Sequence, residues 1–353
     1  MSNRSSGGAL IVGAGAAGLL HALSFRAHGV PIAAVYDPNR RRAERLASLV
    51  GSPRVLDSSS SLAQCNNFTY VSICSPPRAH VEQAEMFADD ARLVFVEKPV
   101  AIARDEMARL ERLRYAVPIV QWRAGRAIRA VRRAIAEGFF GGALSVAIDL
   151  AWHRDVRYFA EGRARRDQWG CGALLSIGIH ALDAVCFALD RPISDVHGAL
   201  GYTPGIDVET RAALAISFRG GTIASLRIAL DAGADDTRIT FCGDGVTATI
   251  HGGEADPTAS AVAWTARDTA REQALRALEQ TTDGQPSGPL IVPFMGRAIE
   301  AYRQGLVPGA SPHFPSVRDV AIAHAAIFRV YEGDARAQRA IQPPSTASTW
   351  PLT

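Results

Sequence analysis

Two side chains of this sequence, Lys98 and His180, are of types that can exchange protons near neutral pH, and their settings suit catalysis. Lys98 is the only lysine among 38 Lys and Arg residues, so arginine serves wherever a positive charge alone is needed. Arginine stays protonated at any useful pH, whereas a buried lysine can shift its pKa and give up its proton. The alternative explanation is a general bias toward arginine in which one lysine remains by chance. The residues around Lys98 must decide between the two explanations.

His180 falls near the start of a predicted amphipathic helix, Leu174–Leu189. Ser176, His180 and Asp183 are spaced i, i+4 and i+7, which places them on one face of that helix. A histidine can accept a hydroxyl proton as a hydride leaves the same carbon. On spacing alone, a histidine that only packs between helices is the alternative.

The first part of the chain must position Lys98, and it alternates short apolar runs with helical patterns. The predicted strands are Ala9–Val12, Pro31–Tyr36, Phe68–Cys74, Leu93–Val96 and Pro118–Gln121, with a weaker one near Val55. The predicted helices between them are Ala16–Ala27, Arg40–Leu49, Ala79–Ala88 and Arg104–Leu113. This alternation is typical of a doubly wound parallel sheet. Lys98 follows one of these strands, so we expect it in the crevice beyond the strand ends.

A glycine-rich turn joins the first predicted strand to the first helix. Gly13, Gly15 and Gly18 are spaced as in the G-x-G-x-x-G signature, with Ala16 and Ala17 at the variable positions. Such a turn and helix N-terminus bind a pyrophosphate, and a carboxylate about 20 residues on binds the ribose hydroxyls.

Asp37 ends the second predicted strand and is the candidate for that carboxylate. It favours NAD, because a carboxylate repels the 2′-phosphate of NADP. Arg40, Arg41 and Arg42 follow it after two residues, and an arginine such as Arg41 could hold that phosphate, so NADP remains open.

The second part of the chain has strands in succession with few helices. They are Ala143–Trp152, Ile193–Tyr202, Thr210–Phe218, Thr222–Leu230, Thr237–Cys242 and Val246–His251, with a hairpin at Arg219-Gly220-Gly221. A helix at about Ile128–Glu137 precedes them, and late helices are predicted at Pro293–Gly305 and Ser316–Tyr331. We therefore predict a Rossmann domain at 1–125, an α+β domain with a large open, mainly antiparallel sheet at 126–333, and a tail at 334–353. The helix at 316–331 is a candidate to pack back on the first domain.

Three ordered motifs resemble the Gfo/Idh/MocA oxidoreductases, named for glucose-fructose oxidoreductase, inositol dehydrogenase and rhizopine catabolism proteins. The resemblance runs from about Gly7 to Tyr331. Its motifs are Ser75-Pro76-Pro77-Arg78-Ala79-His80, Glu97-Lys98-Pro99, and the segment from Gly170 through Gly172, Leu174, Gly178 and His180 to Asp183.

The resemblance implies a cofactor nicotinamide between the two domains, with Lys98 bonded to the reacting oxygen and His180 as the main proton carrier. It also implies a cis Lys98–Pro99 bond and a homodimer or homotetramer. The residues expected around the cofactor are Gly13, Gly15, Ala16, Ala17, Gly18, Asp37, Arg41, Ser75, Pro76, His80, Glu97 and Lys98.

Ser176 departs from the family pattern, because many inositol-dehydrogenase-like members carry Asp there. Serine offers a neutral hydrogen-bonding group, which weakens a strict Lys-Asp-His triad and any transfer of inositol specificity. Asp183 either orients His180 or stabilises structure elsewhere.

The loop Trp152–Trp169 precedes the His180 helix and carries aromatic and basic residues. Tryptophan faces suit sugar C–H surfaces and arginines suit carboxylate or phosphate groups, although a solvated or oligomer-forming loop is an equal alternative. The expected substrate-binding residues are Lys98, Arg123, Trp152, Tyr158, Trp169, Ser176 and His180.

Composition narrows the class of protein. At 353 residues with 48% hydrophobic content and a net charge of +3, the chain reads as a globular protein with no nucleic-acid partner. No uninterrupted apolar run reaches the ~20 residues of a membrane helix, and the early glycines fit a strand–turn–helix better than a signal peptide. The five cysteines are Cys65, Cys74, Cys171, Cys186 and Cys242; they form no C-x-x-C pair, so we expect no metal site and a cytoplasmic location.

Three functions remain in competition. The first is a dehydrogenase that moves a hydride between a nicotinamide and a carbinol carbon of a sugar, sugar derivative or cyclitol. The second is a reductase of an imine, enone or tetrapyrrole on the same fold, which the neutral Ser176 mildly favours. The third is a dinucleotide-sensing regulator, which would have no need of Lys98 and His180.

Overall fold

The first sheet is parallel and has six strands. The computed structural model describes residues 7–59, 62, 68–87, 92–160, 162–252, 257–284 and 289–337. The sheet order is β3-β2-β1-β4-β5-β6. The first three strands are therefore added toward one edge of the sheet and the last three toward the other, with the switch between β1 and β4. The strands are β1 (Gly8–Val12), β2 (Ile32–Tyr36), β3 (Arg54–Val55), β4 (Phe68–Ile73), β5 (Leu93–Val96) and β6 (Ala116–Pro118). Their helices are α1 (Ala16–Ala27), α2 (Arg40–Leu49), α4 (His80–Glu85) and α5 (Arg104–Leu110).

The second sheet has seven strands in the order β13-β12-β11-β7-β10-β9-β8. All its pairs are antiparallel except β7 with β10. Exposed and buried side chains alternate along β9 and β10, so the sheet presents one apolar face to a core. The strands are β7 (Ser145–His153), β8 (Ile193–Gly201), β9 (Arg211–Phe218), β10 (Ile223–Ala229), β11 (Asp231–Gly243), β12 (Val246–Gly252) and β13 (Val262–Ala266).

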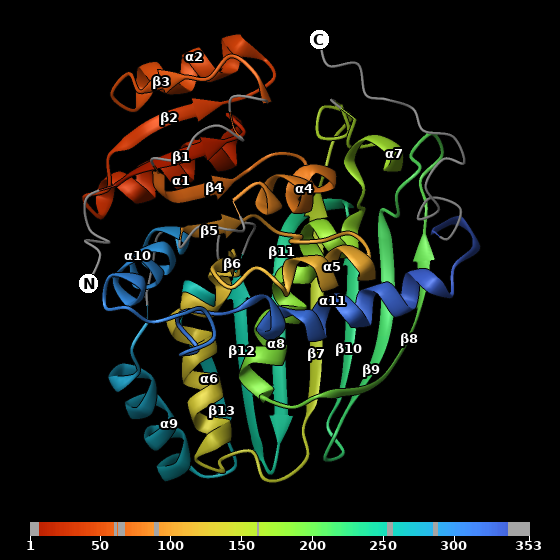
Figure 1. Cartoon of the computed structure of the whole chain (residues 1–353). Helices are drawn as coiled ribbons and strands as arrows, with labels where there is room; N and C mark the ends of the chain where they lie inside the picture. The colour runs from red at the N-terminus through yellow and green to blue at the C-terminus, as the bar shows by residue number, and fades with distance from the viewer. Residues whose placement is uncertain are drawn as a thin grey trace.

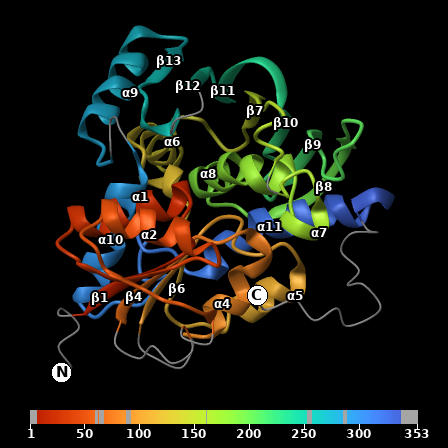
Figure 2. The same cartoon turned by 90° about the horizontal axis from the view of Figure 1, so that it is seen from above.

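Helices cover one face of the large sheet and separate it from the first sheet (Figures 1 and 2). The central one is α8 (Ile179–Leu189), every residue of which is buried. The run Arg166–Leu189 is long and apolar enough to cross a membrane, yet its most apolar window lies wholly inside the fold, as a core helix does. The other helices are α6 (Arg126–Ala136), α7 (Arg166–Trp169), α9 (Thr269–Thr281), α10 (Ile291–Arg303) and α11 (Val317–Glu332).

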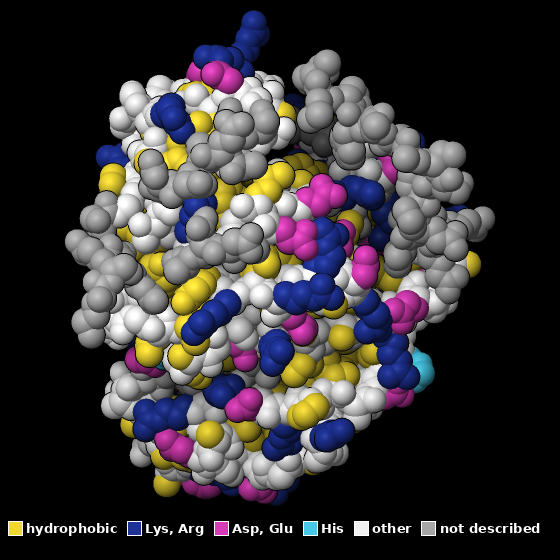
Figure 3. All heavy atoms as spheres, viewed as in Figure 1, with side chains coloured by type: hydrophobic (Ala, Val, Ile, Leu, Met, Phe, Trp, Pro, Cys, Tyr) yellow, Lys and Arg dark blue, Asp and Glu magenta, His cyan; other side chains and the backbone are white. Residues whose placement is uncertain are grey.

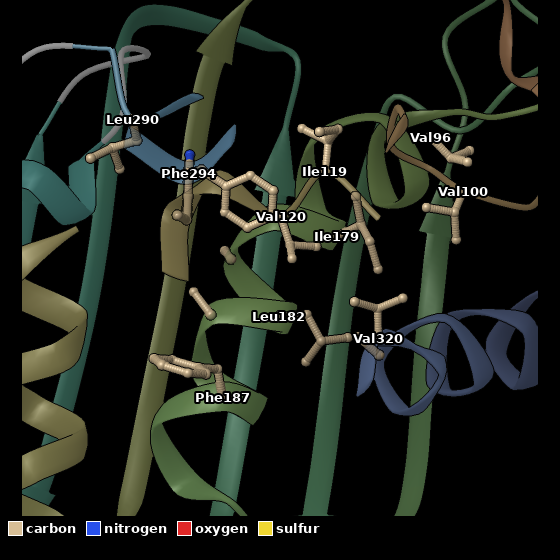
Figure 4. Close-up of a cluster of buried hydrophobic side chains, with 14 of the residues drawn as sticks. Val96, Val100, Ile119, Val120, Ile179, Leu182, Phe187, Leu290, Phe294 and Val320 are labelled. Atoms are coloured by element: carbon tan, nitrogen blue, oxygen red, sulfur yellow. The ribbon is translucent and has the colours of Figure 1, made fainter. Parts of the chain in front are cut away.

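An apolar cluster joins the two domains beneath the strand ends (Figure 4). We call it the joint cluster; each member is at most 6% exposed. It holds residues from β5 and the segment after it, from the segment after β6, and from α8, α10 and α11, so it packs the Lys98 segment against the His180 helix. Its members are Val96, Val100, Ile119, Val120, Ile179, Leu182, Phe187, Leu290, Phe294 and Val320.

The predicted fold class is confirmed, with differences at particular elements. The predicted strand Pro118–Gln121 is wrong, because β6 ends at Pro118 and a short 3₁₀ helix spans Gln121–Ala124. Strand β13 and helix α9 were not predicted from the sequence. Most of the predicted tail, 338–353, and Cys65 lie outside the described residues.

The late helices α10 and α11 pack against elements of the first domain. Helix α11 contacts α5 and β6 as well as α8 and β8, as its predicted packing on the first domain requires. Helix α10 packs along α1, which the sequence did not indicate. An ion pair between Arg104 of α5 and Glu332 of α11 also links the first domain to α11. On the face seen in Figure 3, acidic and basic side chains are interspersed.

Tyr302 of α10 tests this return packing. Its ring is 1% exposed and meets the rings of Tyr70 and Tyr115 edge-on at 5.9 and 6.0 Å. We expect Tyr302→Ala to lower the free energy of unfolding by roughly 3–5 kcal/mol, the usual cost of deleting a large buried ring. Urea unfolding measures it, with the exposed Leu306→Ala as control. Equal effects of the two substitutions would contradict the packing.

Candidate active site

The glycine turn between β1 and α1 has the geometry of a dinucleotide loop. Gly13 adopts φ +99°, a backbone conformation that glycine tolerates best. A Cβ at Gly18 would lie 2.0 Å from the Gly13 carbonyl oxygen, so the third glycine allows close packing of turn and helix. A Cβ at Gly15 would meet nothing within 4 Å, so this side of the turn is open to a ligand.

Asp37 follows β2 and holds the glycine turn. One carboxylate oxygen accepts a hydrogen bond from the Ala14 amide and the other from the Asn39 amide, both at 2.8 Å. The open turn, the helix N-terminus and this carboxylate fit NAD, which supplies a hydride acceptor when bound. Arg41 lies exposed in the first turn of α2, while Arg40 pairs with Glu44 and Asp57.

Lys98 reaches from the first domain into the second. Its Nζ donates a 2.8 Å hydrogen bond to the carbonyl oxygen of Ser176, and its backbone amide donates to Glu97 Oε2 at 3.0 Å. The Lys98–Pro99 bond is cis, as the resemblance implied. Burial lowers the pKa of the Lys98 ammonium, with the guanidinium groups of Arg154 and Arg163 adding to the effect against the opposing charge of Glu97.

His80 supports this segment instead of facing a ligand. It is 1% exposed, with Nδ1 at 2.8 Å from the Pro99 carbonyl oxygen and Nε2 at 2.8 Å from that of Ser75. The expectation that the His80 side chain binds cofactor is therefore corrected, because both ring nitrogens are engaged by the backbone. Ser75 donates its hydroxyl hydrogen bond to Gln83 at 2.6 Å.

Glu97 is anchored by a histidine that the sequence did not single out. His21 of α1 is fully buried, with Nε2 at 3.0 Å from Glu97 Oε1 and Nδ1 bonded to the Ser72 hydroxyl. Burial opposes its protonation, but Cys74 and Glu97 outweigh burial and raise its pKa to about 10. Burial alone would raise the pKa of Glu97, yet His21 and Lys98 lower it to about 2. The pair is thus an imidazolium and a carboxylate at neutral pH.

The surroundings of His180 hold its imidazole in the neutral form. It is 7% exposed and its ring stacks on Trp122, with centroids 5.3 Å apart and an interplanar angle of 17°. Burial and the Lys98 charge lower its pKa well below the usual value, so the imidazole is neutral at pH 7. Among the described residues, its buried Nδ1 has no hydrogen-bond partner. A neutral ring with an unused nitrogen suits a general base.

A π-helical turn, Leu174–Gly178, precedes α8 and carries Ser176. The buried Glu209 holds its start by accepting hydrogen bonds from the Leu174 amide at 3.0 Å, from Arg166 at 2.8 Å and from the Tyr331 hydroxyl at 2.6 Å. Single π turns inside helices are frequent at functional sites. Here the turn brings the Ser176 carbonyl to Lys98 and leaves His180 one residue inside α8.

Ser176 also faces the loop that precedes it. Burial raises the pKa of the Tyr158 hydroxyl, and the nearby Ser176 side chain opposes this shift. Tyr158, Trp169 and Ser176 line one small cavity with Arg163 and Cys171. The structure thus brings three of the expected substrate-binding residues together beside Lys98.

Two expected substrate-binding residues are structural instead. Arg123, 5% exposed, donates two hydrogen bonds to Asp183 at 2.7 and 2.6 Å and one to the Asp319 carbonyl oxygen at 2.8 Å. Asp183 is therefore not the partner of His180. Trp152, 6% exposed, donates its indole hydrogen bond to the Thr237 hydroxyl at 2.9 Å. Arg123 was expected at the cleft because it follows a predicted strand, and Trp152 because it begins the loop before the His180 helix, yet both side chains are buried in the core.

Other functional residues were missed by the sequence analysis. His21 stands three residues after Gly18, a spacing that keeps it on the packed face of α1 and could have signalled its role. Trp122 and Glu209 had no local signal. Within the described ranges, no cluster of three or more His, Cys, Asp or Glu could hold a metal, and Cys74, Cys171, Cys186 and Cys242 are free thiols.

Because Lys98 is the only lysine, its pKa can be read directly. We expect amine-selective acylation of Lys98 to rise with pH at values below the 10.5 of an ordinary lysine, since burial favours the neutral amine. Peptide mass spectrometry across pH 6–11 measures it, with the protein unfolded in urea as control. Identical profiles for folded and unfolded protein would contradict a lowered pKa.

His21 should make stability depend on alkaline pH. Its folded pKa of about 10 exceeds the ordinary 6.5, so its stabilisation is complete below pH 6.5 and is lost as pH rises through 10. We expect the unfolding free energies of the wild type and His21→Gln to converge by more than about 1.4 kcal/mol between pH 6 and 10, the equivalent of one pKa unit.

His28→Gln, on the same helix, is the control and should retain the wild-type pH dependence. A constant difference between wild type and His21→Gln across this range would rule out the imidazolium.

Comparison with solved structures gives relatives of the same fold. The chain is similar to the WlbA dehydrogenase from Bordetella pertussis in complex with NADH and UDP-GlcNAcA, at 19% identity and TM-score 0.77, covering 96% of this chain and 98% of the other. It is also similar to the UDP-N-acetylglucosamine 3-dehydrogenase GnnA from Acidithiobacillus ferrooxidans, at 19% identity and TM-score 0.71, covering 92% and 96%. GenD2 from gentamicin A biosynthesis, in complex with NAD, matches at 18% identity and TM-score 0.71, covering 92% and 93%.

Family models match both domains. Comparison with curated proteins gives no match. Residues 8–115 match the model described as oxidoreductase family, NAD-binding Rossmann fold, and residues 128–249 match the GFO/IDH/MocA C-terminal domain. Together the two models span the glycine turn, Lys98 and His180, in the order that the motifs predicted. The chain belongs to the GFO/IDH/MocA family of NAD-binding oxidoreductases.

Proposed function

We propose that this protein is an NAD-dependent dehydrogenase that oxidises a carbinol carbon of a sugar, sugar derivative or cyclitol, or catalyses the reverse reduction. The observation that carries the proposal is the placement of Lys98 and His180. Lys98 comes from the end of β5 and His180 from the start of α8, and the Lys98 charge lowers the pKa of His180. A cation and a neutral base therefore share one buried site beside the dinucleotide loop.

Lys98 binds and polarises the substrate oxygen. Its ammonium has three donors, of which one is engaged by the Ser176 carbonyl, so the others can hold a hydroxyl or carbonyl oxygen. The charge favours the alkoxide character that develops as the carbinol loses its proton. Glu97 and the buried Pro99 fix the backbone on either side of this residue.

His180 moves the proton. Its lowered pKa keeps the imidazole neutral, and the Trp122 ring restricts its orientation to one plane. The substrate hydroxyl proton passes to this imidazole while Lys98 holds the same oxygen. In the reverse reaction the imidazolium returns the proton to the alkoxide.

Three features support finer proposals. Asp37 at the end of β2 supports NAD over NADP, because its carboxylate would repel a 2′-phosphate. The outward face of the large sheet carries small exposed side chains such as Ala213 and Ala215, which supports a homo-oligomer built on that face. Similarity to the WlbA dehydrogenase, solved in complex with UDP-GlcNAcA, and to the UDP-N-acetylglucosamine 3-dehydrogenase GnnA supports a sugar-like substrate.

Lys98→Met tests the catalytic role. We expect kcat to fall at least 100-fold for whichever sugar, inositol or sugar nucleotide gives NADH in a spectrophotometric panel, because the polarising charge is lost. NADH binding, followed by fluorescence, should stay within about threefold. Lost turnover with retained cofactor binding separates an enzyme from a dinucleotide sensor, whereas unchanged turnover would overturn the proposal. Turnover of imines or enones alone would favour the reductase alternative.

A further inference from the structure

We propose that the substrate carries a carboxylate or phosphate group, and that Arg163 binds this group beside Lys98. This inference rests on the proposed function and adds the charge of the substrate to it. Three observations support it: the way Arg163 is held, its position on the cavity of Ser176, and the balance of charge around Lys98.

Arg163 is held between two aromatic rings. Its guanidinium carbon lies 4.5 Å from the centre of the Trp169 ring and 5.3 Å from that of Tyr158. One of its nitrogens donates a 3.4 Å hydrogen bond to the Tyr158 carbonyl oxygen. Stacking engages the faces of a guanidinium, while its N–H donors point outward in the plane of the group. An arginine fixed in this way is suited to a planar, bidentate contact with a carboxylate or phosphate.

The cavity places Arg163 on the same lining as Ser176, whose carbonyl oxygen contacts Lys98. Arg163, Tyr158 and Ser176 line it together. The Ser176 carbonyl oxygen accepts the hydrogen bond of the Lys98 ammonium, so the residue that lines the cavity also contacts Lys98. A substrate whose reacting oxygen is on Lys98 would therefore extend past Ser176 toward Arg163.

Guanidinium groups add positive charge around Lys98. The nearby carboxylates already have cationic partners, since Glu97 pairs with His21 and Glu209 with Arg166. Arg163 and Arg154 both act on the Lys98 ammonium and lower its pKa, after the larger effect of burial. Asp235 lies 4.0 Å from Arg154, at the limit of an ion pair.

Partly buried cations repel one another, and an anion bound among them relieves that repulsion. A neutral polyol offers no such gain. The site should therefore select anionic sugars over neutral ones, with Arg163 as the residue that decides the preference.

Four probes that share the same pyranose ring and differ in charge test this selectivity on the NADH complex of the full chain. They are D-glucose, D-glucuronate, D-glucose 6-phosphate and UDP-glucose, and their binding is followed by the fluorescence of bound NADH. We expect at least one anionic probe to bind ten times or more tightly than glucose, with the margin shrinking as salt rises from 20 to 300 mM. A preference for glucuronate identifies a carboxylate site, and a preference for either phosphorylated probe identifies a phosphate site.

Arg163→Gln should abolish the preference, whereas Arg163→Lys, which keeps the charge but not the planar fork, should retain part of it. Arg157→Gln is the matched control, because Arg157 is exposed on the same loop. Circular dichroism checks that each variant is folded. Glucose binding as tightly as every anion, no binding of any probe at 10 mM, or an unchanged preference in Arg163→Gln would each overturn the inference.

This inference and the proposed function can fail independently, and the measurements distinguish the two failures. Turnover of neutral and anionic sugars with equal kcat/KM would leave the dehydrogenase intact and refute the anionic substrate. Selective, Arg163-dependent anion binding without turnover of any alcohol would support the anion site and refute the dehydrogenase.

Discussion

The hydrogen bond from Lys98 Nζ to the Ser176 carbonyl is the contact on which the site depends. It joins the end of β5 to the π-helical turn before α8, and thus one domain to the other. A buried ammonium is tolerated only when its charge and protons are engaged, so this bond requires a precise approach of the two segments. The joint cluster supplies that approach, since Val96 and Val100 flank the Lys98 motif while Ile179 precedes His180.

Two buried carboxylates hold the two halves of this contact. Glu97 accepts from the Lys98 amide and from His21, which fixes the segment of the first domain. Glu209 accepts from Arg166, Tyr331 and the Leu174 amide, which fixes the π-helical turn of the second. Each carboxylate has a cationic partner and further donors, the condition under which a buried charge stabilises a fold. The charge of Glu97 also acts on the Lys98 ammonium, so Lys98 shares this carboxylate with His21.

The sequence predicted most of what is local and little of what depends on packing. Hydrophobic periodicity and glycine spacing were sufficient to predict the first sheet. The motifs were sufficient to single out Lys98, Ser176 and His180 as candidate site residues. Arg123 and Trp152 were misassigned because strand position does not reveal which side chains the core will bury. Glu209 was missed because its partners lie 35, 43 and 122 residues away along the chain. The π-helical turn has no periodicity that distinguishes it from the first turn of α8.

The return of α10 to α1 bears on how the molecule can move. The chain crosses between the domains once between β6 and α6 and again on its way to α10, while α11 touches both domains. Domains joined at several places have fewer ways to move than domains joined by one linker. These connections therefore limit changes in the angle between the domains, and with it the approach of Lys98 to Ser176.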